Sequence, residues 1–211
     1  MNALLPVEVH FTLQLWLGLT AAVLSFVAYI PYAIDTFAER TRPQRASWLI
    51  WSVLSIIAFS AQFYEGASTS LWFAGSQAAA SVLIFGLSLR KGTGSIFNSS
   101  DYITLVIAGV GVLVWYLTET AAYTLVITIT ISLLGGVATA TKAWHDPESE
   151  TLMTWVISLV ASVLAILSVG ESDLMLLAYP IYLLVLNLLL IGAIIFGAGG
   201  QSQLPQVMRN R

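Results

Sequence analysis

Two amides and three tryptophans are the side chains of this sequence that could recognise a polar molecule within an otherwise apolar chain. Gln77 and Asn187 each lie inside a long apolar run, where an amide is costly to bury unless it hydrogen-bonds a partner or a ligand. Trp48, Trp51 and Trp155 offer flat aromatic faces, which suit sugar rings and nucleosides alike. These residue types favour binding of a small molecule over bond cleavage.

Residues for catalysis or for a metal are not grouped in the sequence. We expect the two histidines, His10 and His145, to lie on opposite sides of a membrane, and there are no cysteines. Neither a His-Glu-x-x-His zinc motif nor a Gly-x-Ser-x-Gly nucleophile motif occurs. The glycines at 92 and 94 follow no predicted strand, so we interpret this loop as a linker. We therefore expect no enzyme activity, no metal and no cofactor.

Composition indicates the surroundings in which these side chains act. Of 211 residues, 58% are hydrophobic and 9% are charged, too few charges to cover a soluble globule. The net charge of -3 and the eight Lys and Arg residues make a nucleic-acid partner improbable, because such partners need a concentrated basic patch. The sequence predicts an all-α, multi-pass protein of the cell membrane, with the lipid bilayer as its partner.

Seven apolar runs have the length needed to cross about 30 Å of hydrocarbon. They form one transmembrane bundle over residues 1–198, followed by a tail, 199–211, that we expect to be mobile and cytoplasmic. The N-terminal ten residues contain no Lys or Arg, unlike a cleavable signal peptide, so the first run is expected to remain a helix. The runs cover residues 11–37, 46–64, 69–89, 102–118, 121–143, 151–169 and 174–197.

The distribution of charge predicts the orientation of the bundle. With the N-terminus outside, all basic residues fall on the cytoplasmic side, as the positive-inside rule requires. The opposite loops hold four acidic residues and no Lys or Arg. We therefore expect seven spans with the N-terminus outside and the C-terminus inside. The basic residues are Arg40, Arg42, Arg45, Arg90, Lys91, Lys142, Arg209 and Arg211.

The two ends of the chain repeat one helix-loop-helix pattern at a distance of 107 residues. Trp48 becomes Trp155, and Ser25 becomes Ser132, without a gap in the alignment. The run at 102–118 makes the second copy start on the same side of the membrane as the first. The sequence thus predicts two parallel three-helix repeats, 11–89 and 121–197, joined by a linker helix in a 3+1+3 plan.

This plan, together with Pro31-Tyr32, Ser47, Trp51 and Tyr64-x-Gly66, resembles the SWEET sugar transporters and the wider PQ-loop family. Nicotinamide riboside transporters share the seven-helix plan. The resemblance implies that Asn187 contacts substrate, that Gln77 stands for a second asparagine, and that Trp51 or Trp48 and Trp155 supply stacking faces. It also implies that Pro31 acts as a hinge.

Hydroxyl groups extend the predicted polar path along single helix faces. Tyr32 in the first run and Thr139 in the fifth lie on polar stripes, because residues three, four and seven apart share one face of a helix. Ser55 and Ser162 occupy equivalent places in the two copies. We interpret these four as candidate substrate contacts. The alternative for each is a close-packing face on which the hydroxyl bonds its own backbone.

A gate at the cytoplasmic ends of the helices is the second site hypothesis. Asp35 and Lys142 are related by the 107-residue shift, so opposite charges occupy equivalent positions that symmetry could bring together. In the alternative, Asp35 pairs with nearby Arg40 or Arg42, and Lys142 reaches lipid headgroups.

These patterns favour a facilitator-type transporter that moves a small neutral polar metabolite, such as a sugar, by alternating access between the repeats. One alternative is a seven-helix sensor or accessory subunit that binds a ligand without transport. Another is a transporter of nucleosides or vitamin precursors. Assembly into a homo-oligomer is left open by the sequence.

Overall fold

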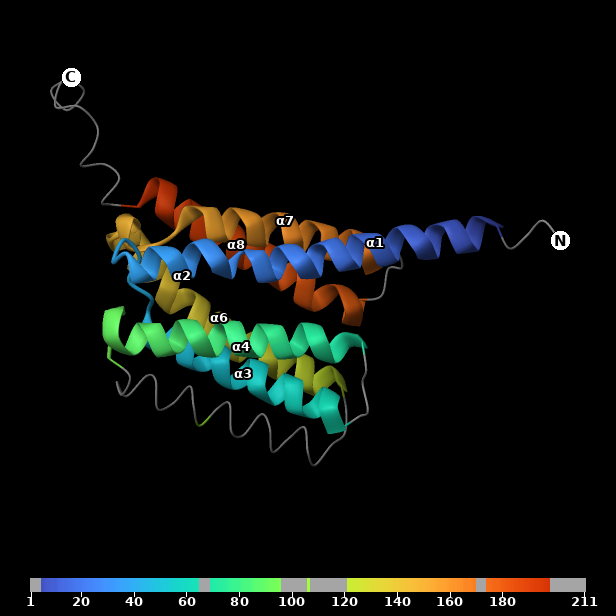
Figure 1. Ribbon diagram of the computed structural model, residues 1–211, viewed down its shortest axis with the longest axis horizontal. Helices are drawn as coiled ribbons and strands as arrows, with labels where there is room; N and C mark the ends of the chain where they lie inside the picture. Colours follow the sequence, from blue (N-terminus) through green and yellow to red (C-terminus); the bar gives the residue numbers. More distant parts are fainter. Residues whose placement is uncertain (1–4, 65–68, 96–105, 107–120, 170–173, 198–211) are drawn as a thin grey trace, which may run out of the picture.

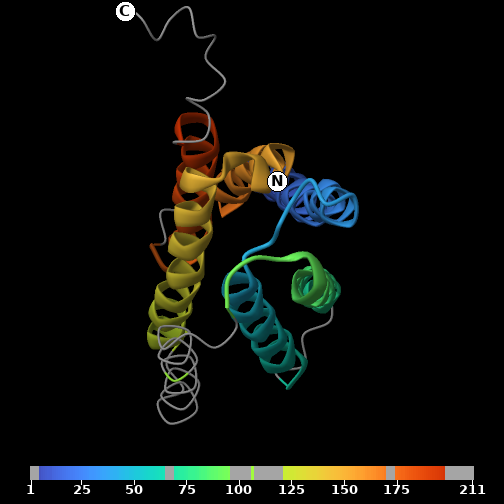
Figure 2. The ribbon, with the colours of Figure 1, turned by 90° about the vertical axis from the view of Figure 1, so that its left-hand side faces the viewer.

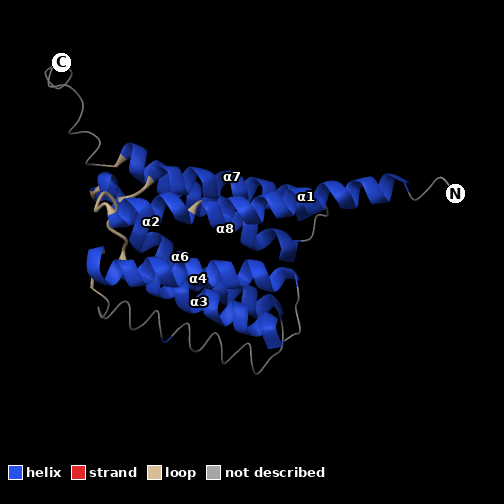
Figure 3. Ribbon diagram, in the orientation of Figure 1, coloured by secondary structure: helices blue, strands red, loops and turns tan. Residues whose placement is uncertain are grey.

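A computed structural model describes residues 5–64, 69–95, 106, 121–169 and 174–197. The described part of the chain is helical, with no strand (Figures 1 and 3). Its elements are α1 (Leu5–Val27), α2 (Tyr29–Phe37), α3 (Arg45–Tyr64), α4 (Thr69–Lys91), α6 (Ala121–His145), the 3-10 turn η1 (Pro147–Ser149), α7 (Leu152–Val169) and α8 (Leu174–Phe196).

Six of the seven predicted apolar runs correspond to these helices. The run predicted at 102–118 and the tail at 199–211 lie outside the described residues, so the count of seven is not established. Among the described residues, four helical stretches are long and apolar enough to cross a membrane, namely residues 13–37, 126–145, 152–169 and 177–196. The described part of the chain is all-helical, as predicted, and its apolar helices are consistent with a membrane protein.

The surface of the bundle is apolar and part of its interior is polar. Phe196 is 68% exposed and Val126 is 63% exposed, whereas Thr36, Ser47 and Thr139 are fully buried. In water this arrangement would be unfavourable, because apolar surface would stay hydrated while hydroxyls lost their water. It suits helices surrounded by hydrocarbon.

Pro31 marks a break in the first long helix. Proline lacks an N–H and its ring crowds the carbonyl four residues earlier, here that of Val27. The regular helix stops at Val27 and resumes at Tyr29, with Ala28 still near helical geometry and its N–H bonded to Leu24. The helix is therefore interrupted at Ala28, three residues before Pro31, the residue that the family resemblance implies as a hinge.

We refer to α1–α4 as the first half and to α6–α8 as the second half. Within the halves, α3 packs on α4, and α8 packs on both α6 and α7. Between the halves, α1 packs along α7 and α3 packs on α6. Figure 2 shows α6 and α8 together along one side, with α7, α1 and α2 at one corner and α3 and α4 at the other.

The start of α3 is attached to the end of α4. The Gln44 side chain accepts a hydrogen bond from the Ser47 backbone N–H at 2.9 Å, which satisfies a free N–H of the first helical turn. Thr93 N–H donates to the Pro43 carbonyl at 2.9 Å, and Arg45 N–H donates to the Thr93 carbonyl at 3.0 Å. The loop before α3 is thus held at a defined place at one end of the bundle.

Candidate functional site

Aromatic rings from both halves meet near one end of the bundle, close to the starts of α3 and α7. The Trp48 ring lies 5.0 Å from Tyr32 and 5.1 Å from Trp51, measured between ring centroids. Trp155 lies 6.1 Å from Tyr32 and 6.3 Å from Trp51. The three tryptophans proposed as stacking faces therefore share one cluster with Tyr32, and Tyr29 packs at its edge, 5.9 Å from Trp48. We call these five residues the aromatic cluster.

A buried carboxylate lies at one end of the aromatic cluster. The side chain of Glu150 has no exposed surface. Its Oε1 accepts a hydrogen bond from the Tyr32 hydroxyl at 3.2 Å, and its Oε2 accepts one from the Trp155 indole at 3.0 Å. The Tyr32 hydroxyl in turn accepts from the Trp48 indole at 3.1 Å. This chain of hydrogen bonds joins the two repeat-related tryptophans through one tyrosine and one glutamate.

Lys142 neutralises the buried carboxylate. Its ammonium lies 2.5 Å from Glu150 Oε1, and its side chain is 11% exposed. The same ammonium donates to the backbone carbonyls of Arg42 at 2.5 Å and Ser149 at 3.2 Å. Because a buried ion is tolerated only when it is paired and its remaining hydrogen-bonding capacity is used, this site is electrostatically complete.

Two loops, one from each half, meet beside this ion pair. The Arg42 N–H donates to the Ser149 carbonyl at 2.9 Å, and the Arg42 guanidinium pairs with Asp146. The hydroxyls of Thr41 and Thr151 are 2.5 Å apart. Thr151 also donates to Asp35 at 3.0 Å. We call these contacts, together with that of Lys142 to the Arg42 carbonyl, the inter-loop contact; it closes one end of the boundary between the halves.

The two residues of the predicted gate have separate partners. Asp35 pairs with Arg40 at 2.6 Å, which is the alternative that the sequence left open for Asp35. Lys142 pairs with Glu150 rather than with Asp35 or with lipid headgroups. Both residues nevertheless take part in the inter-loop contact, Asp35 through Thr151 and Lys142 through the Arg42 carbonyl.

The predicted hydroxyl contacts differ among themselves. Ser55 donates to the carbonyl of Trp51 and bonds the Ser81 hydroxyl at 2.7 Å, so it joins α3 to α4. Ser162 donates to the Leu159 carbonyl within its own helix. These two serines fit the packing alternative. The Thr139 hydroxyl is different, because it is buried without a partner among the described residues.

The two predicted amides come from helices in different halves, Gln77 from α4 and Asn187 from α8. Asn187 is 4% exposed, and the buried α8 residues near it in the chain, Tyr182, Leu186 and Leu190, belong to the same core as the aromatic cluster. The side-chain oxygen of Gln77 is buried with no hydrogen-bond partner among the described residues. A buried amide oxygen without a partner is costly, and water or a ligand commonly satisfies such a group.

Helices α3 and α6 approach closely next to the aromatic cluster. Ser47 donates to the Gly135 carbonyl at 2.7 Å, and the Trp51 indole donates to the Ser132 carbonyl at 3.3 Å. A Cβ at Gly135 would lie 3.2 Å from the Trp51 indole nitrogen. Gly135 therefore lets the first half approach the second half through side chain to backbone hydrogen bonds.

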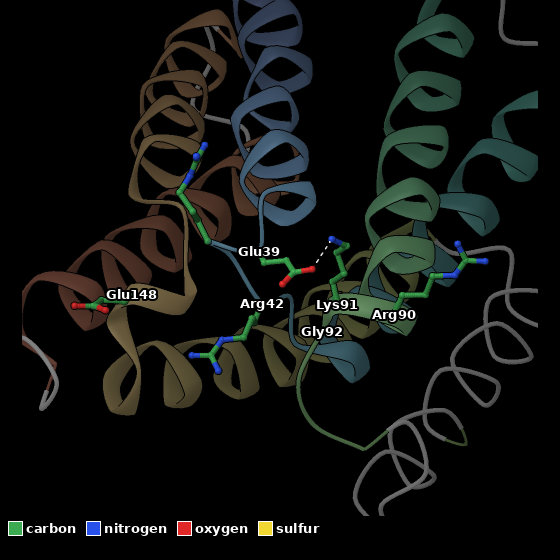
Figure 4. A pocket seen from close by; sticks show the side chains of 7 residues that line it. Glu39, Arg42, Arg90, Lys91, Gly92 and Glu148 are labelled. Carbon is green, nitrogen blue, oxygen red and sulfur yellow. Dashed lines mark hydrogen bonds and ion pairs between the residues drawn. The ribbon is translucent and has the colours of Figure 1, made fainter.

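Two cavities can be described among the residues that the structure describes. One, of about 700 Å³, lies at the end of the bundle near the inter-loop contact (Figure 4). The other, of about 530 Å³, is an apolar groove between α6 and α8 that includes Trp144, Gly192 and Phe196. Neither of these two cavities is lined by Gln77, by Asn187 or by a residue of the aromatic cluster.

Sequence reasoning missed Glu150, the residue on which the site depends. It lies in the loop between two predicted runs and has no role in the sequence-based prediction, whereas its side chain turns inward to the aromatic cluster. One signal was available: Glu150 immediately precedes a predicted span and follows Lys142 by eight residues, across a loop that contains Pro147. A short turn of this kind can bring the carboxylate of Glu150 back to the end of the helix that carries Lys142.

Comparison of the chain with family models, with curated proteins and with solved structures gives no match.

Proposed function

We propose that this protein is a small facilitator-type transporter that moves a neutral polar metabolite by alternating access between its two halves. The observation that supports this most directly is the buried network of Tyr32, Trp48, Trp155, Glu150 and Lys142, which lies between the halves and is contributed by both. A gate requires two distinct arrangements of its parts. Here these would be one in which the network joins the two halves and one in which its hydrogen bonds between the halves are broken.

The packing of the helices supports two parallel repeats. The first span of the first half, α1, packs on the second span of the second half, α7; the second span of the first half, α3, packs on the first span of the second half, α6. This exchange is expected when two similar units are related by a two-fold rotation about the membrane normal. Together with the 107-residue repeat, it favours the 3+1+3 plan and the SWEET-like resemblance.

Opening this boundary would break a limited number of contacts. Glu150 and Lys142 belong to the same half, so their ion pair can persist when the halves separate. At the closed end, the hydrogen bonds that must break are those of Tyr32 with Glu150 and those of the inter-loop contact. The packing of α1 on α7 and of α3 on α6 would have to shift as well. On the orientation expected from the basic residues, this closed end faces the cytoplasm.

A reversible covalent lock tests the proposal. The chain has no cysteine, and the Thr41 and Thr151 hydroxyls are 2.5 Å apart, so Thr41→Cys with Thr151→Cys introduces one defined cysteine pair. In proteoliposomes supplied with a panel of labelled sugars and nucleosides, we expect oxidation to abolish exchange of the transported compound. Reduction should restore the rate, because the lock holds one end of the boundary shut.

The single-cysteine variants serve as controls and should be insensitive to oxidation. Full exchange by the cross-linked protein would contradict the gate. If no compound of the panel is exchanged but one of them still binds, the non-transporting sensor becomes the better interpretation.

Asn187 provides a separate test of the binding site. We expect Asn187→Leu to weaken ligand binding at least ten-fold while leaving the thermal unfolding midpoint close to that of the native protein. If the Asn187 amide bonds a ligand rather than another side chain, its removal weakens binding without leaving a protein group unpaired. Leucine fills a similar volume, so the fold should keep its stability. Calorimetric titration of the transported compound measures the change. Unchanged affinity in both Asn187→Leu and Gln77→Ala would remove these amides from the site.

A further inference from the structure

The cavity of about 700 Å³ at the end of the bundle is a groove rich in cations. Four basic side chains line it together with two carboxylates and the backbone at Gly92. Figure 4 shows the labelled side chains distributed around the groove, with the loop that leads to α3 passing between them. The charged residues are Arg40, Arg42, Arg90, Lys91, Glu39 and Glu148.

Other basic residues at this end are occupied within the protein. Arg45 donates to the backbone carbonyls of Ser88 at 3.0 Å and Gly94 at 2.7 Å, and Lys142 pairs with buried Glu150. The groove arginines Arg40 and Arg42 also form ion pairs, with Asp35 and Asp146, but their side chains remain 65% and 51% exposed. Among the described basic residues, Arg40 and Arg42 therefore combine internal ion pairs with exposure to the surroundings, whereas the side chain of Lys142 is only 11% exposed.

The ion pairs of the groove can be exchanged for another anion. Lys91 contacts Glu39 at 2.8 Å, and this hydrogen bond, together with the charge of Lys91, lowers the pKa of the Glu39 carboxyl. Glu39 is nevertheless 75% exposed, and exposed pairs of this kind contribute little to stability. Arg90, at the end of α4, has no ion-pair partner among the described residues.

Apolar side chains lie on the helices that lead into this groove. Ile34 and Phe37 precede Glu39 at the end of α2 and are 55% and 59% exposed; Leu89 precedes Arg90 in α4 and is 46% exposed. In a membrane-embedded bundle these residues face hydrocarbon, so the cations beyond them lie at the level of the lipid headgroups. A free anion would not contact this apolar surface, whereas a lipid would cover it with its acyl chains.

We propose that this groove binds the phosphate of an anionic phospholipid, with the acyl chains lying along the exposed apolar residues of α2 and α4. Arginine side chains form paired hydrogen bonds with phosphate oxygens, and basic grooves next to spanning helices attract anionic lipids. Because Arg42 also belongs to the inter-loop contact, a bound lipid would lie beside the boundary between the halves.

Lipid titration of the purified full-length chain in detergent tests this proposal. We expect phosphatidylglycerol to bind more tightly than phosphatidylcholine with the same acyl chains, as measured by native mass spectrometry. Arg90→Gln should weaken phosphatidylglycerol binding about five-fold, equivalent to roughly 1 kcal/mol for one cation near an anionic lipid. Glu39→Gln should strengthen it by a similar factor, because it removes a negative charge and releases Lys91.

The opposite signs of these two changes separate lipid binding from a general effect on folding. Thr141→Ala, on the other groove, is the control and should change neither affinity. Equal binding of the two lipids, or no change with Arg90→Gln, would overturn the proposal. Inorganic phosphate is the probe for a soluble anion; if it binds as tightly as phosphatidylglycerol, the groove is an anion site without a role for lipid.

Discussion

Replacing Glu150 with alanine is expected to lower the free energy of unfolding by about 3–5 kcal/mol. The change would leave the Lys142 ammonium, which is 11% exposed, without a counter-ion, and the Tyr32 hydroxyl and Trp155 indole without their acceptor. Chemical unfolding in detergent, followed by tryptophan fluorescence, measures the loss. Two of the seven tryptophans, Trp48 and Trp155, lie in the affected network and contribute to this signal.

A paired substitution separates charge from packing. Glu150→Leu combined with Lys142→Met removes both buried ions, and such replacements are often neutral or stabilising. We expect the double variant to be considerably more stable than Glu150→Ala. A loss below about 1 kcal/mol for Glu150→Ala would mean that water reaches this carboxylate, in conflict with its burial.

Gly92→Ala is expected to cost about 1–3 kcal/mol, the range for forcing extra atoms into a packed region. A Cβ there would lie 2.4 Å from the Ser88 carbonyl oxygen and 2.5 Å from that of Pro43. Both atoms are backbone and cannot move aside as a side chain would. The change would push the end of α4 away from the start of α3, and the same unfolding measurement would detect it.

Gly86 lies within α4 and is the control for Gly92, which directly follows the end of that helix. No atom lies within 4 Å of the position that its Cβ would occupy. Alanine is a better helix former than glycine, by up to about 1 kcal/mol in exposed positions. We expect Gly86→Ala to be neutral or slightly stabilising; equal losses at both glycines would show that close contact is not the cause.

The helices could be predicted because their signal is long and uniform. Each apolar run extends over many helical turns. In hydrocarbon the backbone N–H and C=O groups have no water to bond, so such a run forms a continuous helix that satisfies them internally. The ends were less certain: α6 extends two residues beyond its predicted end, to His145, because nothing in the sequence stops it before Pro147. The convergence of Trp48 and Trp155 on Tyr32 agrees with their shared place in the repeat.

The charged part of the site could not be derived in the same way. A shift of 107 residues identifies Asp35 and Lys142 as equivalent, but equivalent positions are close only if they lie near the symmetry axis. Arg40, five residues away along the chain, reaches Asp35 more directly. The inward turn of Glu150 depends on the path of a loop, and a loop has no periodicity from which the direction of a side chain follows.

The pairing of α1 with α7 has a consequence for biosynthesis. α1 ends at Val27 and its principal partner begins at Leu152, so a ribosome working at 5–20 residues per second needs roughly 6 to 25 s to supply that partner. During this interval α1 has to remain in the bilayer on the strength of its own hydrophobicity. The most apolar 18 residues within 13–37 have a mean hydropathy of 1.8, so this stretch is long and apolar enough to cross a membrane.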